Sequence, residues 1–169
     1  MNPHVQPFFD DDSCTWTYLV SDPASAAAVV IDPVLDFDPK SGNTATHSAQ
    51  KVLDAVRERG LRLEWILETH AHADHLSAGH WLRTQCPGAK LAIGEGIRRV
   101  QATFREIFNL GEHFPVDGSQ FDRLFADGER FAIGDLEVAV IATPGHTNDS
   151  VSYRIGTAVF VGDTLFMPD

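Results

Sequence analysis

Three histidines and an aspartate stand within six consecutive residues near the middle of this chain. They have the spacing H-x-H-x-D-H, formed by His70, His72, Asp74 and His75, and only Glu68 and Thr69 separate them from the apolar run 65–67. Neutral imidazole and carboxylate suit zinc and ferrous iron, whereas thiolate clusters and all-oxygen sites select other metals. A solvated loop with a chance run of histidines is the alternative, but so many ionisable groups in so short a stretch favour a metal site.

The position of the motif indicates how its side chains converge. Residues 63–67 are predicted to form a strand, so the motif occupies a loop at the strand's carboxyl end. His70 and His72, two residues apart in extended backbone, can point the same way, while Asp74 and His75 curl to the other side of a cavity. The loop can therefore contribute to two half-sites, and it needs further ligands from elsewhere in the chain.

Two later positions supply ligands of the required type. His146 lies in Thr143-Pro144-Gly145-His146-Thr147 after a predicted strand, and Asp163 follows Gly162 after another. We expect His146 to complete a nitrogen-rich site and Asp163 to bind one metal or bridge two. Asp32, which ends a third predicted strand, is within possible reach of the loop, but an aspartate before Pro33 is better interpreted as a turn residue.

The remaining histidines show no grouping by spacing. We interpret them as solvated or structural: His4, His47, His80 and His113. The two cysteines, Cys14 and Cys86, are too few for a disulfide framework and have no C-x-x-C pattern.

Length and charge restrict the class of protein. The chain has 169 residues, which fits one domain spanning residues 1–169, and its formal net charge is −11. Nucleic acid is excluded as a partner because phosphate binding needs a basic surface. No apolar run approaches the ~20 residues of a membrane helix, and the N-terminus lacks signal-peptide features. We therefore expect no membrane partner and a cytoplasmic location.

The order of predicted elements indicates an α/β fold with two facing sheets and helices outside. The expected strands are 14–20, 27–33, 63–67, 90–93, 129–133, 136–142, 150–155 and 158–161, and the expected helices are about 49–59, 77–83 and 95–108. The last four strands follow one another at hairpin spacing without a helix between them. In the third helix, core packing explains the apolar stripe of Ile97, Val100, Phe104 and Phe108.

With these motifs, the chain resembles the metallo-β-lactamase superfamily. The resemblance rests on Thr69 to His75, Pro144-Gly145-His146-Thr147 and the run from Phe160 to Phe166, and it covers nearly the whole chain. It implies the αβ/βα sandwich of two facing mixed sheets with outer helices. Within the superfamily, the motif sequences are most similar to those of the persulfide dioxygenases, including the bacterial β-lactamase-like hydrolase branch. The glyoxalase II enzymes are the nearest alternative.

The two families imply different uses of the same residues. A persulfide dioxygenase would hold one Fe(2+) per chain at His70, His146 and Asp163 and would oxidise glutathione persulfide to sulfite and glutathione with O2. His72, Asp74 and His75 would then orient the ligands, with Asp74 and His75 as the expected catalytic residues. A glyoxalase II-like thioester hydrolase would hold one or two Zn(2+) or iron ions, with these residues as ligands of the second metal. A homodimer is left open.

The chain ends six residues after Asp163, whereas the family that it resembles continues. The resemblance therefore implies a domain that is truncated at its C-terminus, without the late histidine of a second metal site. A non-catalytic metal-binding fragment is a third hypothesis, and it predicts an exposed apolar face.

Overall fold

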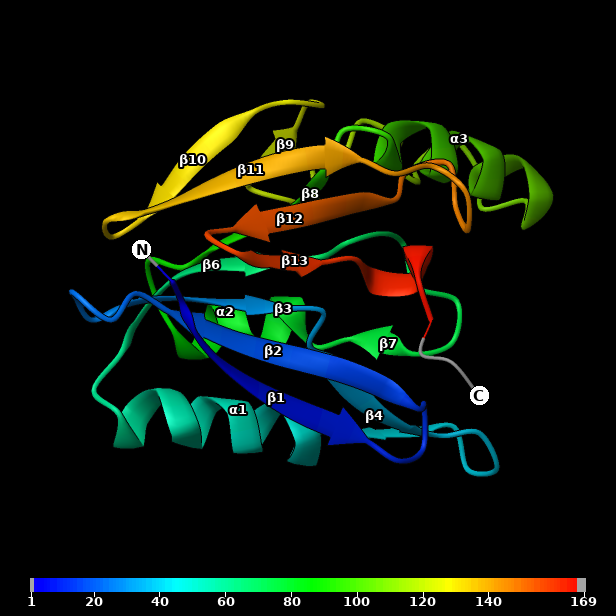
Figure 1. Cartoon of the computed structure of the whole chain (residues 1–169). Coiled ribbons are helices and arrows are strands. Elements are labelled where there is room, and N and C mark those ends of the chain that lie inside the picture. The colour runs from blue at the N-terminus through cyan, green and yellow to red at the C-terminus, as the bar shows by residue number, and fades with distance from the viewer. Residues whose placement is uncertain (1, 167–169) are drawn as a thin grey trace.

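The computed structural model describes residues 2–166, whose strands form two main sheets that face each other (Figure 1). The first sheet has the strand order β1-β2-β3-β6-β8-β9. Its strands are β1 His4–Asp10, β2 Thr15–Ser21, β3 Ala27–Ile31, β6 Arg62–Leu67, β8 Lys90–Gly94 and β9 Arg123–Phe125. The pairs among β1, β2 and β3 are antiparallel, and those from β3 to β9 are parallel, so this sheet is mixed.

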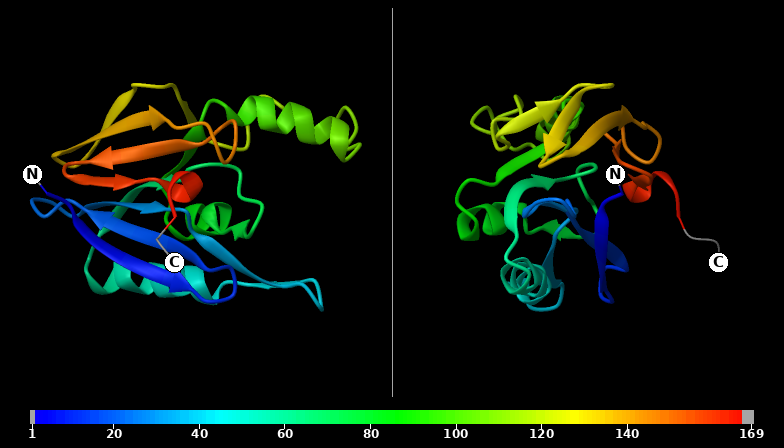
Figure 2. Two further views of the ribbon diagram at one scale, coloured as in Figure 1. Left: turned by 45° about the vertical axis from the view of Figure 1, so that its right-hand side comes forward. Right: turned by 60° about the vertical axis from the view of Figure 1, so that its left-hand side comes forward.

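The second sheet is a series of hairpins, as the strand spacing predicts. Its strands, in spatial and sequence order, are β10 Arg130–Ile133, β11 Leu136–Ala142, β12 Val151–Ile155 and β13 Ala158–Phe160, and every pair is antiparallel. A small third sheet joins β5 Asn43–Ala45, β4 Val34–Asp38 and β7 Leu76–Ser77. The α/β sandwich expected from the sequence is confirmed, and Figure 2 shows its two layers from further sides.

The first sheet is buried on both faces, and β3 shows how. Val29 and Ile31 pack between the two sheets, whereas Ala28 and Val30 pack toward the helices. Because successive side chains of a strand point to opposite faces, a continuous apolar run such as 27–31 fits a central strand covered on both sides.

Two helices cover the outer face of the first sheet. These are α1 His47–Glu58 and α2 Gly79–Gln85, which contribute Val52, Leu53 and Leu82 to the outer core. Both lie close to their predicted positions. Gly60, with a φ of 61°, follows the end of α1 in the left-handed conformation that glycine adopts without strain.

The apolar stripe of α3 Ile97–Ile107 is not a core stripe, so that prediction was wrong. Ile97 is buried, but Phe104 is 41% exposed and Phe108 is 62% exposed. The reason is that α3 projects beyond the edge of the sheets, so only its first turns meet the rest of the protein (Figures 1 and 2). Periodicity predicts an apolar face but not a neighbour for it.

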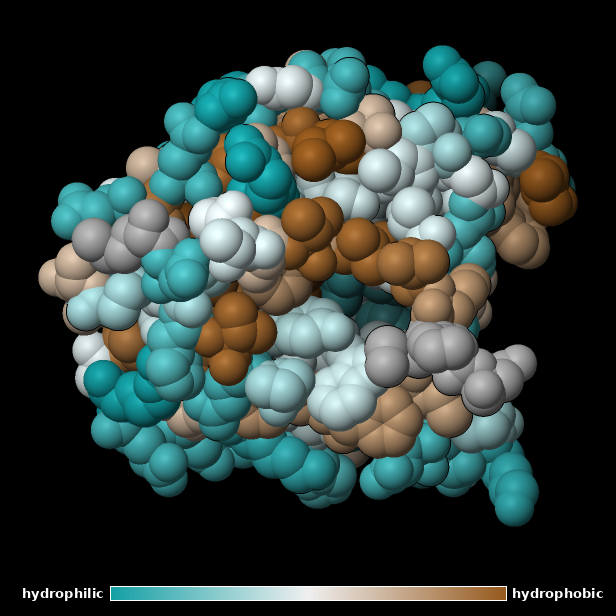
Figure 3. Space-filling model, in the orientation of Figure 1, coloured by the Kyte–Doolittle hydropathy of each residue, from teal (hydrophilic) through white to brown (hydrophobic). Residues whose placement is uncertain are grey.

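Other apolar side chains reach the surface near the C-terminal end of the described region. A row of hydrophobic residues crosses the face in Figure 3 at the level of β13, and Val159, Leu165 and Phe166 are each at least half exposed. The predicted truncation of the domain concerns residues 167–169, which lie outside the described residues. Within residues 2–166, no helix is long and apolar enough to cross a membrane.

Candidate metal centre

The H-x-H-x-D-H motif lies in a loop between two strands of different sheets, which we call the histidine loop (residues 68–75). It begins where β6 ends, and it ends at β7, whose Leu76 and Ser77 pair with Leu35 and Val34 of β4. The Ala78 N–H also donates to the Pro33 carbonyl at 2.8 Å. Both ends of the loop are therefore anchored, which limits how far its side chains can move.

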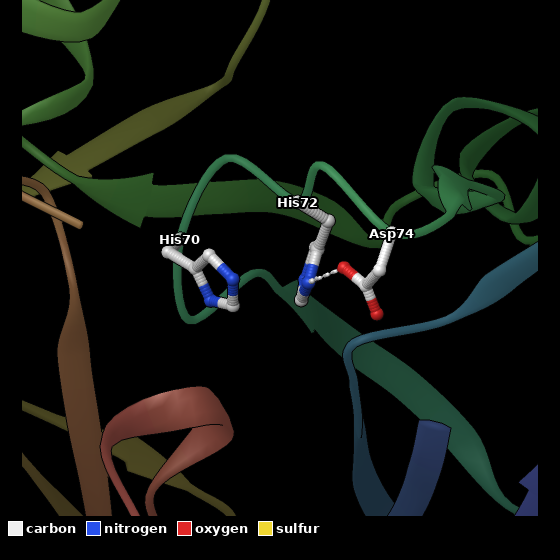
Figure 4. A group of neighbouring side chains, drawn as sticks. All are labelled: His70, His72 and Asp74. Carbon is white, nitrogen blue, oxygen red and sulfur yellow. Dashed lines mark ion pairs between the residues drawn. The ribbon is translucent and has the colours of Figure 1, made fainter. Parts of the chain in front are cut away.

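His70 and His72 lie together as the spacing predicts, and Asp74, which was expected on the other side of a cavity, lies with them. Figure 4 shows His70, His72 and Asp74 on one loop, with the His72 and Asp74 side chains turned toward each other. Nδ1 of His72 lies 4.0 Å from an Asp74 carboxylate oxygen, and the His70 and His72 rings are 4.1 Å apart between centroids. These three residues offer ligand atoms that all lie within 4.8 Å of one another.

A second group brings together residues from three separate loops. His146 lies in the loop after β11, which we call the His146 loop (residues 143–150), and Asp163 lies on the 3-10 helix η1 Gly162–Thr164 after β13. The nearer Asp163 oxygen is 3.3 Å from Nε2 of His146 and 3.9 Å from Nε2 of His70. The three predicted ligands therefore meet at one end of the sandwich, with ligand atoms within 4.8 Å of one another.

The hydrogen bonds of His70 leave the right nitrogen free for a metal. The Thr69 hydroxyl donates to Asp32 at 2.9 Å, so it accepts from Nδ1 of His70 at 3.0 Å. Nδ1 of His70 then carries the proton, and the lone pair of Nε2 points toward Asp163. Nε2 of His70 is buried and has no hydrogen-bond partner among the described residues. This donor set fits ferrous iron or zinc.

Burial also keeps His70 in the form that binds a metal. Burial lowers the pKa of His70, and the nearby His72 lowers it further. A neutral imidazole is the metal-binding form of histidine.

His72 is held between two buried carboxylates. Its Nε2 is 3.0 Å from an Asp32 oxygen and 3.4 Å from a Glu68 oxygen. Burial alone would lower the pKa of His72, but Asp32 and Glu68 outweigh it and raise this pKa to about 11. Since Nε2 faces these carboxylates, a metal could reach His72 only at Nδ1, and Nδ1 would have to lose its proton first.

Asp32 connects both imidazoles, a role that the turn interpretation missed. One carboxylate oxygen contacts His72 directly, and the other reaches His70 through Thr69. Its backbone bends before Pro33 with a φ of 50°, in the left-handed region that aspartate tolerates, but the side chain is buried against the histidine loop. The sequence signal that favoured contact with the histidine loop was the position of Asp32 directly after a fully buried strand.

Three further residues at this site were not predicted as part of it. Glu68 contacts His72 and accepts the Ser77 hydroxyl, and burial raises the pKa of Glu68. Asp149 accepts the Ala71 N–H, and Tyr153 donates to the Glu68 carbonyl. Asp149 and Tyr153 lie about 80 residues from their partners, so no local pattern reveals them. In contrast, the histidines interpreted as solvated are all exposed and outside the ligand groups: His4, His47, His80 and His113.

His75 completes the polar lining of the site. Its ring lies 4.1 Å from that of His72 between centroids, and its Nδ1 is 3.0 Å from the Leu76 carbonyl oxygen. Nε2 of His75 is buried without a hydrogen-bond partner in residues 2–166. Asp74, more exposed, accepts the Thr15 hydroxyl at 3.0 Å.

Comparison with known proteins identifies the family of this chain. The family model described as "Metallo-beta-lactamase superfamily" matches residues 11–169. A "Beta-lactamase hydrolase-like protein" from Agrobacterium fabrum is 52% identical over 99% of this chain and 38% of its own length. "Glyoxylase B2" from Dictyostelium discoideum is 50% identical over 98% of this chain and 57% of its own length.

More distant relatives carry a different name. A mitochondrial persulfide dioxygenase from Homo sapiens is 32% identical over 96% of this chain and 53% of its own length. The crystal structure of ETHE1 from Myxococcus xanthus superposes with a TM-score of 0.75 at 32% identity, covering 97% of this chain and 59% of that one. The chain thus spans about half the length of these relatives.

Proposed function

Because the chain belongs to the metallo-β-lactamase superfamily, we propose that it carries the metal centre of a mononuclear non-haem iron persulfide dioxygenase. The observation that carries the proposal is the convergence of His70, His146 and Asp163, two imidazoles and one carboxylate from three loops. This ligand set is the one found in non-haem Fe(II) oxygenases. The similarity to persulfide dioxygenases supports the same reaction.

The proposed reaction converts glutathione persulfide, O2 and water into glutathione and sulfite. The S–S bond of the persulfide breaks, its outer sulfur is oxidised to sulfite, and O2 is reduced. Ferrous iron, one per chain, would supply the activation of O2 that this oxidation needs. The chain's own residues must hold the iron and the substrate and must handle the protons that are released.

Each residue has a distinct part in this proposal. His70, His146 and Asp163 hold the metal. Asp32 fixes the orientation of His70 through Thr69 and contacts His72 directly, as outer partners of metal ligands generally do. We assign Asp74 and His75 to substrate orientation and proton transfer, because they lie beside His72 at the same end of the sandwich.

The experiment combines metal analysis with oxygen uptake. The chain is loaded anaerobically with Fe(II), and we expect about one iron per chain and O2 consumption with glutathione persulfide. His146→Ala should lose both, whereas His113→Ala, a histidine change in an exposed loop, should keep both. An intact, iron-loaded protein that takes up no O2 would remove the dioxygenase proposal.

A second candidate is a dinuclear thioester hydrolase related to glyoxalase II. It is favoured by the group of His70, His72 and Asp74 and by Nε2 of His75, which has no hydrogen-bond partner among residues 2–166, because they offer ligands for a second ion. The 50% identity to Glyoxylase B2 supports the same candidate. Asp74→Asn distinguishes the two: zinc content should fall from two ions to one per chain in the dinuclear site, whereas iron content should stay at one in the mononuclear site.

A further inference from the structure

Three hydrogen bonds join the histidine loop to β12 and the residues just before it. The Tyr153 hydroxyl donates to the Glu68 carbonyl at 2.9 Å, and the Val151 N–H donates to the Thr69 carbonyl at 2.9 Å. The Ala71 N–H donates to an Asp149 carboxylate oxygen at 3.0 Å. Val151 and Tyr153 of β12, together with Asp149 two residues before that strand, thus hold successive parts of a loop that leaves the first sheet.

Asp149 differs from the other two because it is itself part of the His146 loop. It lies three residues after His146, and its partner Ala71 directly follows His70. The peptide unit that carries the Ala71 N–H begins at the Cα of His70, so fixing that N–H fixes the backbone on which His70 stands. One hydrogen bond therefore connects the backbone beside one predicted ligand to the loop of another.

The Asp149 side chain is buried but incompletely bonded. The residue is 2% exposed, and its second carboxylate oxygen has no hydrogen-bond partner among the described residues. Buried carboxylates are costly unless their bonds compensate for lost hydration. A carboxylate kept here with a single bond indicates that its position serves the site.

The turn that contains Asp149 rests on the segment before α3. A Cβ atom added to Gly96 would lie 2.8 Å from the Cα of Asp149 and 3.3 Å from the Asn148 carbonyl oxygen. A Cβ atom added to Gly94 would lie 3.2 Å from the Asp149 carbonyl oxygen. Only residues without side chains leave room for the turn, so Gly94 and Gly96 set its position from the other side.

We propose that Asp149 is a positioning residue that fixes the His146 loop relative to His70, and that Gly96 provides the surface against which it is held. The inference rests on the metal site proposed above, because it assigns a geometric task to two of its ligand loops. It requires that loss of the hydrogen bond between Asp149 and the Ala71 N–H weakens metal binding in a protein that still folds.

The test measures binding of Co(II), used as a probe, by competition with a chromophoric chelator, together with the visible absorption spectrum of the cobalt-loaded protein. Asp149→Ala should weaken Co(II) binding at least about tenfold and alter the spectrum, in the range known for outer partners of metal ligands. Asp149→Asn keeps an acceptor for the Ala71 N–H, and its binding should stay within about threefold of the starting protein.

Asp22→Ala is the matched control. Asp22 is also 2% exposed, and it also accepts a backbone N–H, that of Asp135 in the β10–β11 turn at 2.9 Å, but at the opposite end of the sandwich. This variant should lower the melting temperature while leaving Co(II) affinity and spectrum unchanged. Gly96→Ala, which pushes on Asp149 from another element, should reproduce the spectral change even if Asp149→Ala does not fold.

Distinct outcomes separate this inference from the proposed site. Failure of the unaltered chain to bind Co(II) would count against the metal site itself. If that chain binds Co(II), unchanged affinity and spectrum in a folded Asp149→Ala or in Gly96→Ala would overturn the role of Asp149. Equal loss of binding in Asp22→Ala, or no recovery in Asp149→Asn, would also overturn it.

Discussion

At each end of the sandwich, a buried aspartate carboxylate accepts a backbone N–H group from a distant segment. The two carboxylates differ in how many of their oxygens have hydrogen-bond partners. At the end formed by the β2–β3 and β10–β11 turns, the Asp22 carboxylate accepts the N–H groups of Asp135 and Ala24 and the hydroxyl of Ser25. At the end that carries the histidine loop, Asp149 accepts one N–H, and its other oxygen has no partner within residues 2–166.

This difference extends beyond the two aspartates. The buried side-chain atoms without a hydrogen-bond partner in the described chain all lie at the histidine-loop end: Glu68 Oε2, His70 Nε2, His75 Nε2 and Asp149 Oδ1. Native proteins pair nearly all buried polar groups, so such exceptions need a reason. For His70 Nε2 and His75 Nε2 a proposed metal site supplies that reason, because a site that binds a metal must leave ligand atoms without internal partners. Glu68 Oε2 instead faces Nε2 of His72 at 3.4 Å.

The largest effect on stability is expected from breaking the buried contact between Asp32 and His72. Asp32→Ala leaves the His72 imidazolium without its closest carboxylate and removes the acceptor of Thr69. Removing one partner of a buried ion pair costs about 3–5 kcal/mol, so the free energy of unfolding should fall by that amount. Urea denaturation in the presence of a chelator measures this change without a contribution from metal.

A double-mutant cycle is the control for this prediction. Removing both partners in Asp32→Ala/His72→Ala leaves no uncompensated charge, so the double variant should lose less than the sum of the two single variants. Additive losses would show that the two side chains contribute independently, contrary to the pair that the structure places at 3.0 Å.

The sequence predicts well what is local. The H-x-H-x-D-H spacing and the strand before it were sufficient to expect that His70 and His72 point the same way, but Asp74 was expected on the other side of a cavity and instead joins them. His146 and Asp163 stood out because each follows a strand. The paired strands of the second sheet were predictable for the same reason, since hairpins connect neighbours in sequence.

What the sequence does not predict depends on contacts between distant segments. Asp149 and Tyr153 bind backbone groups of the histidine loop. Every residue has a backbone N–H or carbonyl, so the sequence does not indicate which one is the partner. Likewise, the apolar stripe of α3 indicated a buried face, yet Phe104 and Phe108 stay exposed because the helix projects beyond the sheets. Five strands within residues 2–166 were not predicted, namely β1, β4, β5, β7 and β9. Of these, β4 and β7 pair with each other although about 40 residues separate them, and β7 is too short to show a periodicity of its own.

A matched pair of glycines distinguishes the two ends more finely. Gly134 has a φ of 56°, and a Cβ atom added there would lie 2.5 Å from an Asp22 carboxylate oxygen. Gly162 has a φ of 49°, and a Cβ atom added there would lie 2.9 Å from the Cβ of Thr69. Either change to alanine should cost about 1–3 kcal/mol, because an L side chain is strained in this conformation and meets a neighbour. Only Gly162→Ala displaces Asp163, so only it should also weaken Co(II) binding, by at least about tenfold.

Thermal unfolding and cobalt titration of both variants make this comparison. Similar losses of stability with divergent metal affinity would support separate roles for the two ends. Weakened binding in Gly134→Ala would contradict them, because that glycine contacts the Asp22 end alone.

The smallest effect concerns the pH dependence of the Asp22 end. The N–H groups of Asp135 and Ala24 lower the pKa of the Asp22 carboxyl. A carboxyl with a lowered folded-state pKa stabilises the protein above its unfolded-state pKa of about 3.9, and this contribution is lost as the pH falls through the folded-state value. The stability difference between the unaltered chain and Asp22→Asn should thus be full at pH 7 and should shrink below about pH 4. Urea midpoints of both proteins across this range measure it, and a difference that persists undiminished at low pH would show that the bonds of Asp22 do not depend on its charge.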